Sequence, residues 1–171
     1  MRLFPFSVLY IAPGIEVRED IDKELALEKL IGYSFKDKVL RNRAITRKAW
    51  VNDQGPGSEI AHPGLATLGD AVIGLVVVSY YYSLGYTPEQ ITNEMILRVS
   101  RENHTAIASK IGLKDCLKLG KCEGKSKEWD KGAALGESFE EVIGAVYLDD
   151  IKHGGNGIDV CNKVLKKVEL I

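Results

Sequence analysis

The chain of 171 residues has little cysteine and no excess of either charge. Its three cysteines, Cys116, Cys122 and Cys161, are odd in number and lack CxxC spacing, which argues against a disulfide framework and a zinc site and favours a reducing compartment. Lys and Arg number 23 against 24 Asp and Glu. No field of the whole chain therefore draws it toward phosphate or anionic lipid, and any contact with nucleic acid must come from local patches.

Long apolar runs and targeting signals are also scarce. The apolar opening, Met1 to Ala12, is interrupted by Pro5 and leads to no convincing cleavage site, so we do not expect a signal peptide. We expect no membrane span, which would need about 20 apolar residues. Apolar residues make up 45% of the chain, an ordinary globular value that excludes collagen and disorder. We therefore expect a soluble, cytoplasmic protein.

Hydrophobic periodicity predicts helices along most of the chain and no strands. The predicted helices cover residues 20–31, 34–50 (with Ser34 as the cap), 65–84, 88–99 (after Thr87), 105–111, 114–119, 133–150 and 158–170. The Gly- and Pro-rich segment 52–63 and the lysine-rich segment 121–131 are typical of loops. Segment 65–84 is apolar nearly all round, which predicts a central helix. The fold class is therefore a single all-α domain.

Two carboxylates hold similar positions on two of these helices. Residues four apart stack on one helix face, so Asp70 lies between Ala66 and Gly74, and Glu140 likewise lies between two glycines. A carboxylate where backbones approach closely is costly to bury unless it is paired or holds a metal. Glu137, one turn before Glu140, could serve the same ligand from the edge. The pattern thus favours a metal site.

Structural alternatives to a metal site exist for these acids. Thr67 and Asp70 fit a T-x-x-D capping box, in which Asp70 would only start its helix. Glu137 and Glu141 would suit the positive end of a helix dipole, and we expect Glu141 to face solvent. In a chain with 17 glycines, one of the two arrangements of small residues around an acid could also arise by chance. Spacing alone leaves both interpretations open.

Four ordered blocks resemble a ribonuclease III domain. The blocks are 27–50 (LEKLIGYSFKDKVLRNRAITRKAW), 64–72 (GLATLGDAV), 99–123 (VSRENHTAIASKIGLKDCLKLGKCE) and 137–149 (ESFEEVIGAVYLD). The resemblance implies an all-α, dimeric ribonuclease III domain-like fold that cleaves double-stranded RNA with Mg²⁺ held by carboxylates, and Mn²⁺ as a substitute. We expect no double-stranded-RNA-binding domain, and in this the chain resembles the compact Mini-III branch. Residues 1–19 would then be an N-terminal extension and 20–171 the ribonuclease III-like domain.

The family's acidic residues carry over only in part. The family signature has two glutamates, seven and four residues before its Asp, and these places hold Pro63 and Ala66 here. The signature Asp is present as Asp70, and the later block keeps its glutamate as Glu140. Glu137 replaces the aspartate that opens that block and keeps its charge. The resemblance therefore implies Asp70, Glu137 and Glu140 as catalytic residues and metal ligands.

Other residues are candidates for ligand replacement, RNA contact or dimer contact. His62 and Glu59 could replace a lost ligand, although loop residues of these types are more often only solvated. The residues expected to bind RNA are Lys36, Lys38, Arg43, Arg47, Lys48, Asn103, Lys125 and Lys127. Solvated faces and, for Asn103, a structural turn are the alternatives. Thr67 stands where the family has an aromatic that docks into the partner, so the apolar N-terminal segment is expected to supply replacement contact area.

Two function classes follow from the resemblance. The first is a Mg²⁺-dependent endoribonuclease that hydrolyses phosphodiester bonds in double-stranded or structured RNA. The second is a catalytically impaired homologue that acts as an RNA-binding or ribosome-associated structural protein, because two signature glutamates are lost. In both, the expected partners are RNA and a second copy of the chain, and no membrane.

Overall fold

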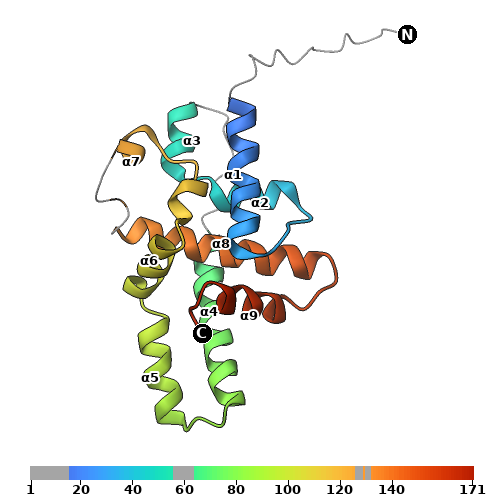
Figure 1. Ribbon diagram of the computed structural model, residues 1–171, viewed down its shortest axis with the longest axis vertical. Helices are drawn as coiled ribbons and strands as arrows, with labels where there is room; N and C mark the ends of the chain where they lie inside the picture. Colours follow the sequence, from blue (N-terminus) through green and yellow to red (C-terminus); the bar gives the residue numbers. More distant parts are fainter. Residues whose placement is uncertain (1–15, 56–63, 126–128, 130–131) are drawn as a thin grey trace.

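The computed structural model describes residues 16–55, 64–125, 129 and 132–171. Their helices are α1 (Glu16–Ile31), α2 (Lys38–Ile45), α3 (Lys48–Gln54), α4 (Leu65–Ser83), α5 (Pro88–Arg98), α6 (Arg101–Lys110), the 3₁₀ turn η1 (Leu113–Cys116), α7 (Lys121–Lys125), α8 (Ala133–Lys152) and α9 (Gly157–Lys167) (Figure 1). Within the described ranges no strand forms, and Thr46 and Lys118 make an isolated parallel bridge. The predicted all-α class is confirmed.

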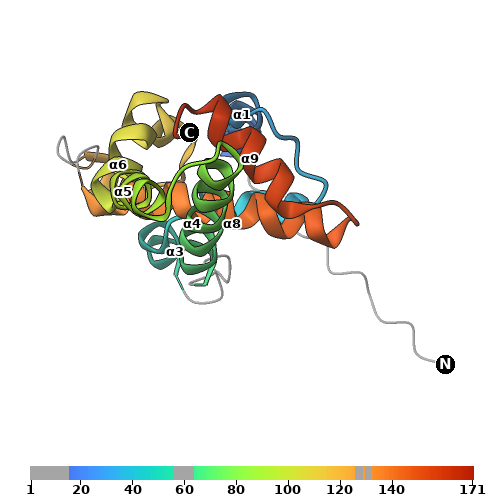
Figure 2. The ribbon, with the colours of Figure 1, turned by 90° about the horizontal axis from the view of Figure 1, so that it is seen from below.

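The helices α4 and α8 cross at the centre of the molecule (Figures 1 and 2). Glycines allow the close approach: a Cβ on Gly69 would lie 1.8 Å from the backbone oxygen of Glu140, and one on Gly144 would lie 2.3 Å from a backbone oxygen of α4. By contrast, Gly74, which is expected to share a helix face with Asp70, faces open space. The crossing brings the carboxylates of Asp70 on α4 and Glu140 on α8 close together. Helices α2, α6 and α9 pack around α8.

Helix α4 is long and apolar enough to cross a membrane by length and composition alone, with a mean hydropathy of 1.5 over 18 of its residues. This finding corrects the expectation that no apolar run approaches the required length. The helix buries Val72, Ile73, Val76 and Val77 in the same core as residues of α8 and α9. Burial of these side chains in the core accounts for part of its apolar character.

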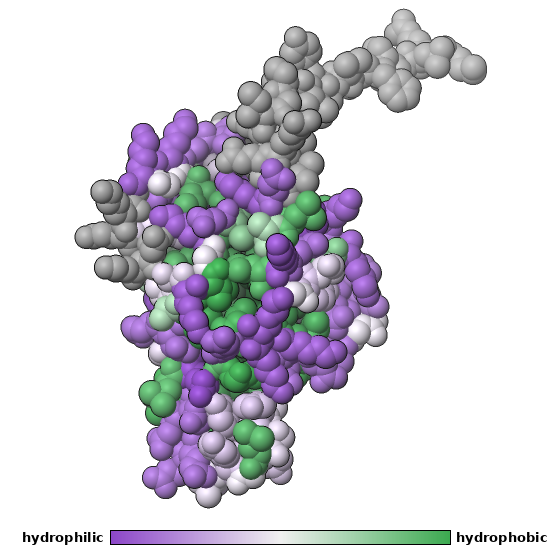
Figure 3. Space-filling model, viewed as in Figure 1, coloured by the Kyte–Doolittle hydropathy of each residue, from purple (hydrophilic) through white to green (hydrophobic). Residues whose placement is uncertain are grey.

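Helices α4 and α5 form a hairpin that projects from the body of the molecule (Figure 1). The predicted cap of α5 is confirmed: Thr87 accepts a hydrogen bond from the backbone N–H of Gln90, whose side chain bonds back to Thr87. Apolar side chains reach the surface on this hairpin (Figure 3); they are Leu75, Tyr82, Leu84, Tyr86, Met95, Ile96 and Leu97. None of the residues of α5 is fully buried, so apolar and polar side chains alike stay exposed at this end of the fold.

The region predicted as one helix from Ser34 is in fact two. Asp37, and not Ser34, caps α2, because its carboxylate accepts two backbone N–H groups of the first turn. The chain then leaves the helix after Ile45 and pairs with a distant segment: Lys118 N–H donates to the Ile45 carbonyl at 2.8 Å, and Arg47 N–H donates to the Lys118 carbonyl at 3.1 Å. This tertiary pairing replaces helical hydrogen bonds and separates α2 from α3.

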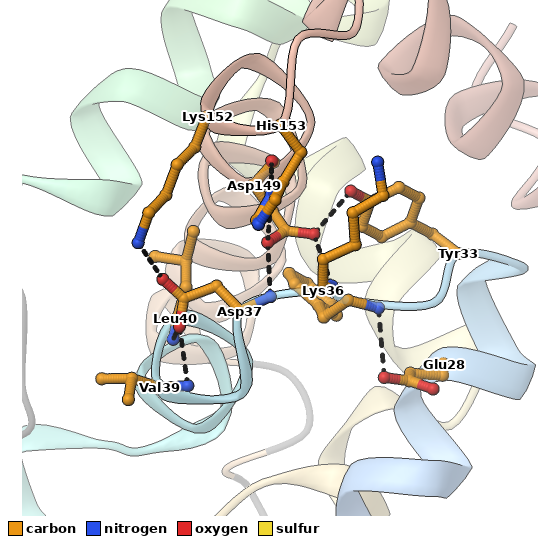
Figure 4. Close-up of polar contacts among 10 residues, drawn as sticks. Glu28, Tyr33, Lys36, Asp37, Val39, Leu40, Asp149, Lys152 and His153 are labelled. Atoms are coloured by element: carbon orange, nitrogen blue, oxygen red, sulfur yellow. Dashed lines mark hydrogen bonds and ion pairs between the residues drawn. The ribbon is translucent and has the colours of Figure 1, made fainter.

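One fully buried carboxylate ties the start of α2 to α8 (Figure 4). Asp149 accepts hydrogen bonds from the Tyr33 hydroxyl at 2.7 Å and from the backbone N–H groups of Lys36 at 2.9 Å and Asp37 at 2.8 Å. Burial alone would raise the pKa of Asp149, but these donors hold the pKa below its usual value. Asp37 also pairs with Lys152 at 2.6 Å. The cluster explains why this loop is ordered without a helical cap at Ser34.

The remaining differences from the predicted helices concern their ends. Helix α6 begins at Arg101, four residues before the predicted start at 105, because the Ser100 hydroxyl accepts the backbone N–H of Asn103 at 3.2 Å. The predicted helix 114–119 is only the 3₁₀ turn η1, and the lysine-rich loop contains the short helix α7.

Candidate metal centre

A pocket of about 350 Å³ opens beside the crossing of α4 and α8. It is lined by Ala66, Thr67, Asp70, Val99, Arg101, Glu137 and Glu140. The three acids predicted from the sequence therefore share one pocket. The guanidinium-bearing Arg101, at the first position of α6, adds a cation to the same space.

Asp70 lies inside α4 and not at its start. The helix begins at Leu65 after Gly64, and no side chain caps it. The capping-box interpretation with Thr67 is therefore wrong, because Asp70 stands beyond the first turn. Its side chain is exposed and lines the pocket, where a carboxylate can meet a ligand that enters from solvent.

Glu140 contacts a histidine that the sequence analysis did not identify. The Nδ1 atom of His104 lies 2.8 Å from Glu140 Oε1, and His104 is fully buried. One ligand atom each from Asp70, His104 and Glu140 lie within 4.8 Å of one another. The other ring nitrogen of His104, Nε2, is buried without a hydrogen-bond partner among the described residues. Two carboxylates and an imidazole are a donor set that fits a divalent cation.

Glu137 is held at the edge of this pocket by Arg47. Arg47 Nη1 lies 3.0 Å from Glu137 Oε2 and 3.7 Å from Glu141 Oε2, and its Nε lies 3.6 Å from Glu123 Oε1. Glu137 does not belong to the group of ligand atoms that come within 4.8 Å of one another. Of the three predicted acids, the structure thus brings Asp70 and Glu140 together and leaves the third beside a guanidinium.

The expectation that Glu141 faces solvent is wrong. Its side chain is only 18% exposed, and Glu141 Oε2 is among the buried atoms without a hydrogen bond. Burial raises the pKa of Glu141 to about 7; the Arg47 guanidinium opposes this rise, and the neighbouring carboxylates add to it. A helix-dipole role at the surface does not describe this residue, because α8 carries it into the packed layer beside Arg47.

The residues expected to bind RNA have different surroundings. Arg47 is 11% exposed and engaged by carboxylates, so its guanidinium does not point freely into solvent. Asn103 donates from Nδ2 to the Arg98 carbonyl at 3.0 Å and holds the turn between α5 and α6. This is the structural role that is the alternative to RNA contact for this residue. The exposed candidates are Lys36, Lys38, Lys48 and Lys125, and Arg43 is half-buried. The candidates Lys127, Glu59 and His62, together with Pro63 and residues 1–15, lie outside the described residues.

Comparison with known proteins agrees with this geometry. A family model, described as ribonuclease-III-like, matches residues 37–168. Ribonuclease 3 of Helicobacter acinonychis is 32% identical over 146 residues, which are 84% of this chain and 57% of the relative. Ribonuclease 3 of Syntrophotalea carbinolica is 33% identical over 142 residues, 82% of this chain and 59% of the relative. The chain thus spans somewhat more than half the length of these curated relatives.

Solved structures show the same fold. The nuclease domain of ribonuclease III from Campylobacter jejuni superposes with a TM-score of 0.67 at 24% identity, covering 84% of this chain and 94% of that chain. A second structure of that domain gives the same TM-score at 25% identity. The matched range 37–168 includes every residue that lines the pocket and His104. The chain therefore belongs to the ribonuclease-III-like family.

Proposed function

We propose that this chain is a ribonuclease III-type endoribonuclease that hydrolyses phosphodiester bonds in double-stranded RNA with a divalent cation, Mg²⁺ in the first instance. The observation that carries the proposal is the placement of Asp70 and Glu140 across the α4–α8 crossing, with their ligand atoms within 4.8 Å of each other in one pocket. The relatives named ribonuclease 3 support the same activity. All residues assigned to this chemistry lie within 20–171, the range expected for the ribonuclease III-like domain.

The residues of the pocket have different proposed roles. Asp70 and Glu140 would hold the cation, which supplies a Lewis acid and an activated water when bound. Arg101 places a guanidinium in the pocket, where it can pair with the phosphate oxygens of the RNA backbone. Glu137 stays beside Arg47, outside the group of ligand atoms that Asp70 and Glu140 form, and adds negative charge at the edge of the pocket.

Duplex RNA is recognised mostly by shape, through contacts to phosphate and 2′-hydroxyl groups. The exposed lysines Lys36, Lys38, Lys48 and Lys125 are the described candidates for such contacts. Because the chain carries a net charge of only −1, these local groups and not a global field would supply the attraction.

A homodimer completes the proposal. The Campylobacter jejuni nuclease domain has a region involved in dimer formation. In this chain the exposed apolar side chains of the α4–α5 hairpin offer contacts that a second copy can cover by two-fold pairing. Two sites related in this way can each cut one strand. The free cysteines support a reducing, cytoplasmic location.

Incubation of the protein with long duplex RNA and Mg²⁺ or Mn²⁺ tests the activity. We expect cleavage by the wild type and a loss of at least about 100-fold in Asp70→Asn, because one anionic ligand is removed. The alternative of a non-catalytic RNA-binding homologue is favoured by Ala66, which lines the pocket where the family has a glutamate. Retained RNA binding with no cleavage under either cation would establish that alternative and overturn the enzymatic proposal.

A further inference from the structure

The proposed hydrolysis assigns no role to His104, although its ring contacts Glu140, which lines the pocket. Helix α6 carries it, and its ring packs 5.8 Å from the ring of Phe139 on α8. The side chain is fully buried, yet Nδ1 reaches the carboxylate of Glu140. A buried polar ring directed at one acid of a pocket, and within 4.8 Å of a second, is placed where a cation would be bound.

The spacing between the ring and the carboxylate suits two ligands of one ion. Small divalent cations hold their ligands at roughly 2.0–2.1 Å in octahedral geometry, which puts adjacent ligand atoms about 2.9 Å apart. The observed distance from His104 Nδ1 to Glu140 Oε1 is 2.8 Å. Asp70 completes the set from the exposed side, where its side chain is free to turn toward the other two.

The ring is also able to offer a lone pair at this place. In the present arrangement a proton on Nδ1 can be shared with Glu140, but Nε2 has no hydrogen-bond partner among the described residues. Because Nε2 has no acceptor or donor beside it in the described part of the chain, nothing at that nitrogen forces the proton to stay on Nδ1. With the proton on Nε2, the neutral ring presents the Nδ1 lone pair to a cation between itself and Glu140.

We propose that His104 is the third ligand of the cation site, and that the resulting set of two carboxylates and one imidazole binds Co²⁺ and Mn²⁺ in preference to Mg²⁺. Mg²⁺ favours oxygen ligands, whereas an imidazole nitrogen favours later transition metals in the order Mn²⁺ below Co²⁺. The inference rests on the proposed function only in using the same cation site. To the proposed activity it adds the order in which the site binds these cations, and Mg²⁺ remains the cation proposed for cleavage.

Equilibrium binding of Mg²⁺, Mn²⁺ and Co²⁺ to the RNA-free protein, followed by calorimetry, tests this inference. The test variant is His104→Asn, because the asparagine amide can still donate to Glu140 but lacks the ring nitrogen. The matched control is His153→Asn, at the end of α8, where the histidine contacts Asp149 and not the pocket. We expect the wild type to bind Co²⁺ at least tenfold more tightly than Mg²⁺.

The ratio of the two affinities separates a ligand from a positioning residue. In His104→Asn we expect the ratio of Co²⁺ to Mg²⁺ affinity to fall at least tenfold, and the visible spectrum of bound Co²⁺ to change, with both unchanged in the control. An equal loss for all three cations would make His104 a positioning residue for Glu140 and would overturn the ligand role. Unchanged affinities would overturn it as well.

Two further measurements keep the inference separate from folding and from activity. If His104→Asn does not fold, wild-type selectivity decides alone, and Mg²⁺ binding as tight as Co²⁺ binding overturns the inference. Asp70→Asn should weaken both cations, because it removes a ligand that they share. A protein that selects Co²⁺ through His104 but cleaves no duplex RNA would reject the proposed nuclease and leave the metal site standing.

Discussion

Glu140→Gln is the substitution that tests the candidate site most directly. In the wild type, His104 Nδ1 lies 2.8 Å from Glu140 Oε1. The change keeps the size of the side chain and an oxygen at this place, but it removes the negative charge that would hold a cation. Loss of a group that only orients a metal ligand costs roughly 10–100-fold in affinity or activity. Loss of a direct ligand should exceed that, so we expect cleavage of duplex RNA to fall by more than about 100-fold.

The same change should leave the fold nearly as stable as before. A hydrogen bond to a charged group contributes about 1.5–3 kcal/mol and one between neutral groups about 1 kcal/mol, so the weaker contact to His104 costs on the order of 1 kcal/mol. Against this, the substitution relieves repulsion from the neighbouring carboxylates, since the charge of Glu140 helps to raise the pKa of Glu141. The two effects oppose each other, and the unfolding free energy should change by no more than about 1 kcal/mol.

Cleavage of duplex RNA and urea unfolding, measured on the same samples, distinguish a metal ligand from a structural partner. Glu102→Gln, at an exposed place on the first turn of α6, is the matched control. Glu141 is unsuitable for this purpose, because it is largely buried beside Arg47. Two folded variants with the same activity would refute the catalytic role of Glu140. A loss of about 1–3 kcal/mol, with activity that follows the folded fraction, would identify a structural role instead.

Three more predictions follow from packing, burial and exposure. Gly144→Ala should cost about 3 kcal/mol or more in thermal unfolding, because its Cβ would lie 2.3 Å from a backbone oxygen, whereas Gly74→Ala has open space and should be tolerated. Glu141, with a pKa raised from 4.5 to about 7, should cost the fold up to about 3 kcal/mol as the pH rises from 4.5 through 7, and Glu141→Gln should remove this slope in urea titrations between pH 5 and 8; equal slopes would contradict it. Ile96→Glu, at a side chain 66% exposed on the α4–α5 hairpin, should convert a dimer to a monomer in sedimentation at tens of micromolar, and an unchanged dimer would place the interface elsewhere.

Much of the helical layout was evident from the sequence because it depends on local spacing. The nearly uniform apolar character of 65–84 predicted α4, and Thr87 with Pro88 predicted the cap of α5, since capping involves residues within one turn. The family blocks added Asp70 and Glu140 as partners. Their shared pocket agrees with that pairing, which periodicity alone left open.

The tertiary structure decided what depends on neighbours far along the chain. The break between α2 and α3 comes from backbone pairing with Lys118, which no local propensity encodes. The surroundings of Arg47 and Glu141 depend on α8 packing beside the segment before α3, so a guanidinium expected to bind RNA pairs with carboxylates instead. His104 joins Glu140 only because α6 packs against α8. Helical spacing determines which side chains share a face, whereas packing of the core determines which faces meet.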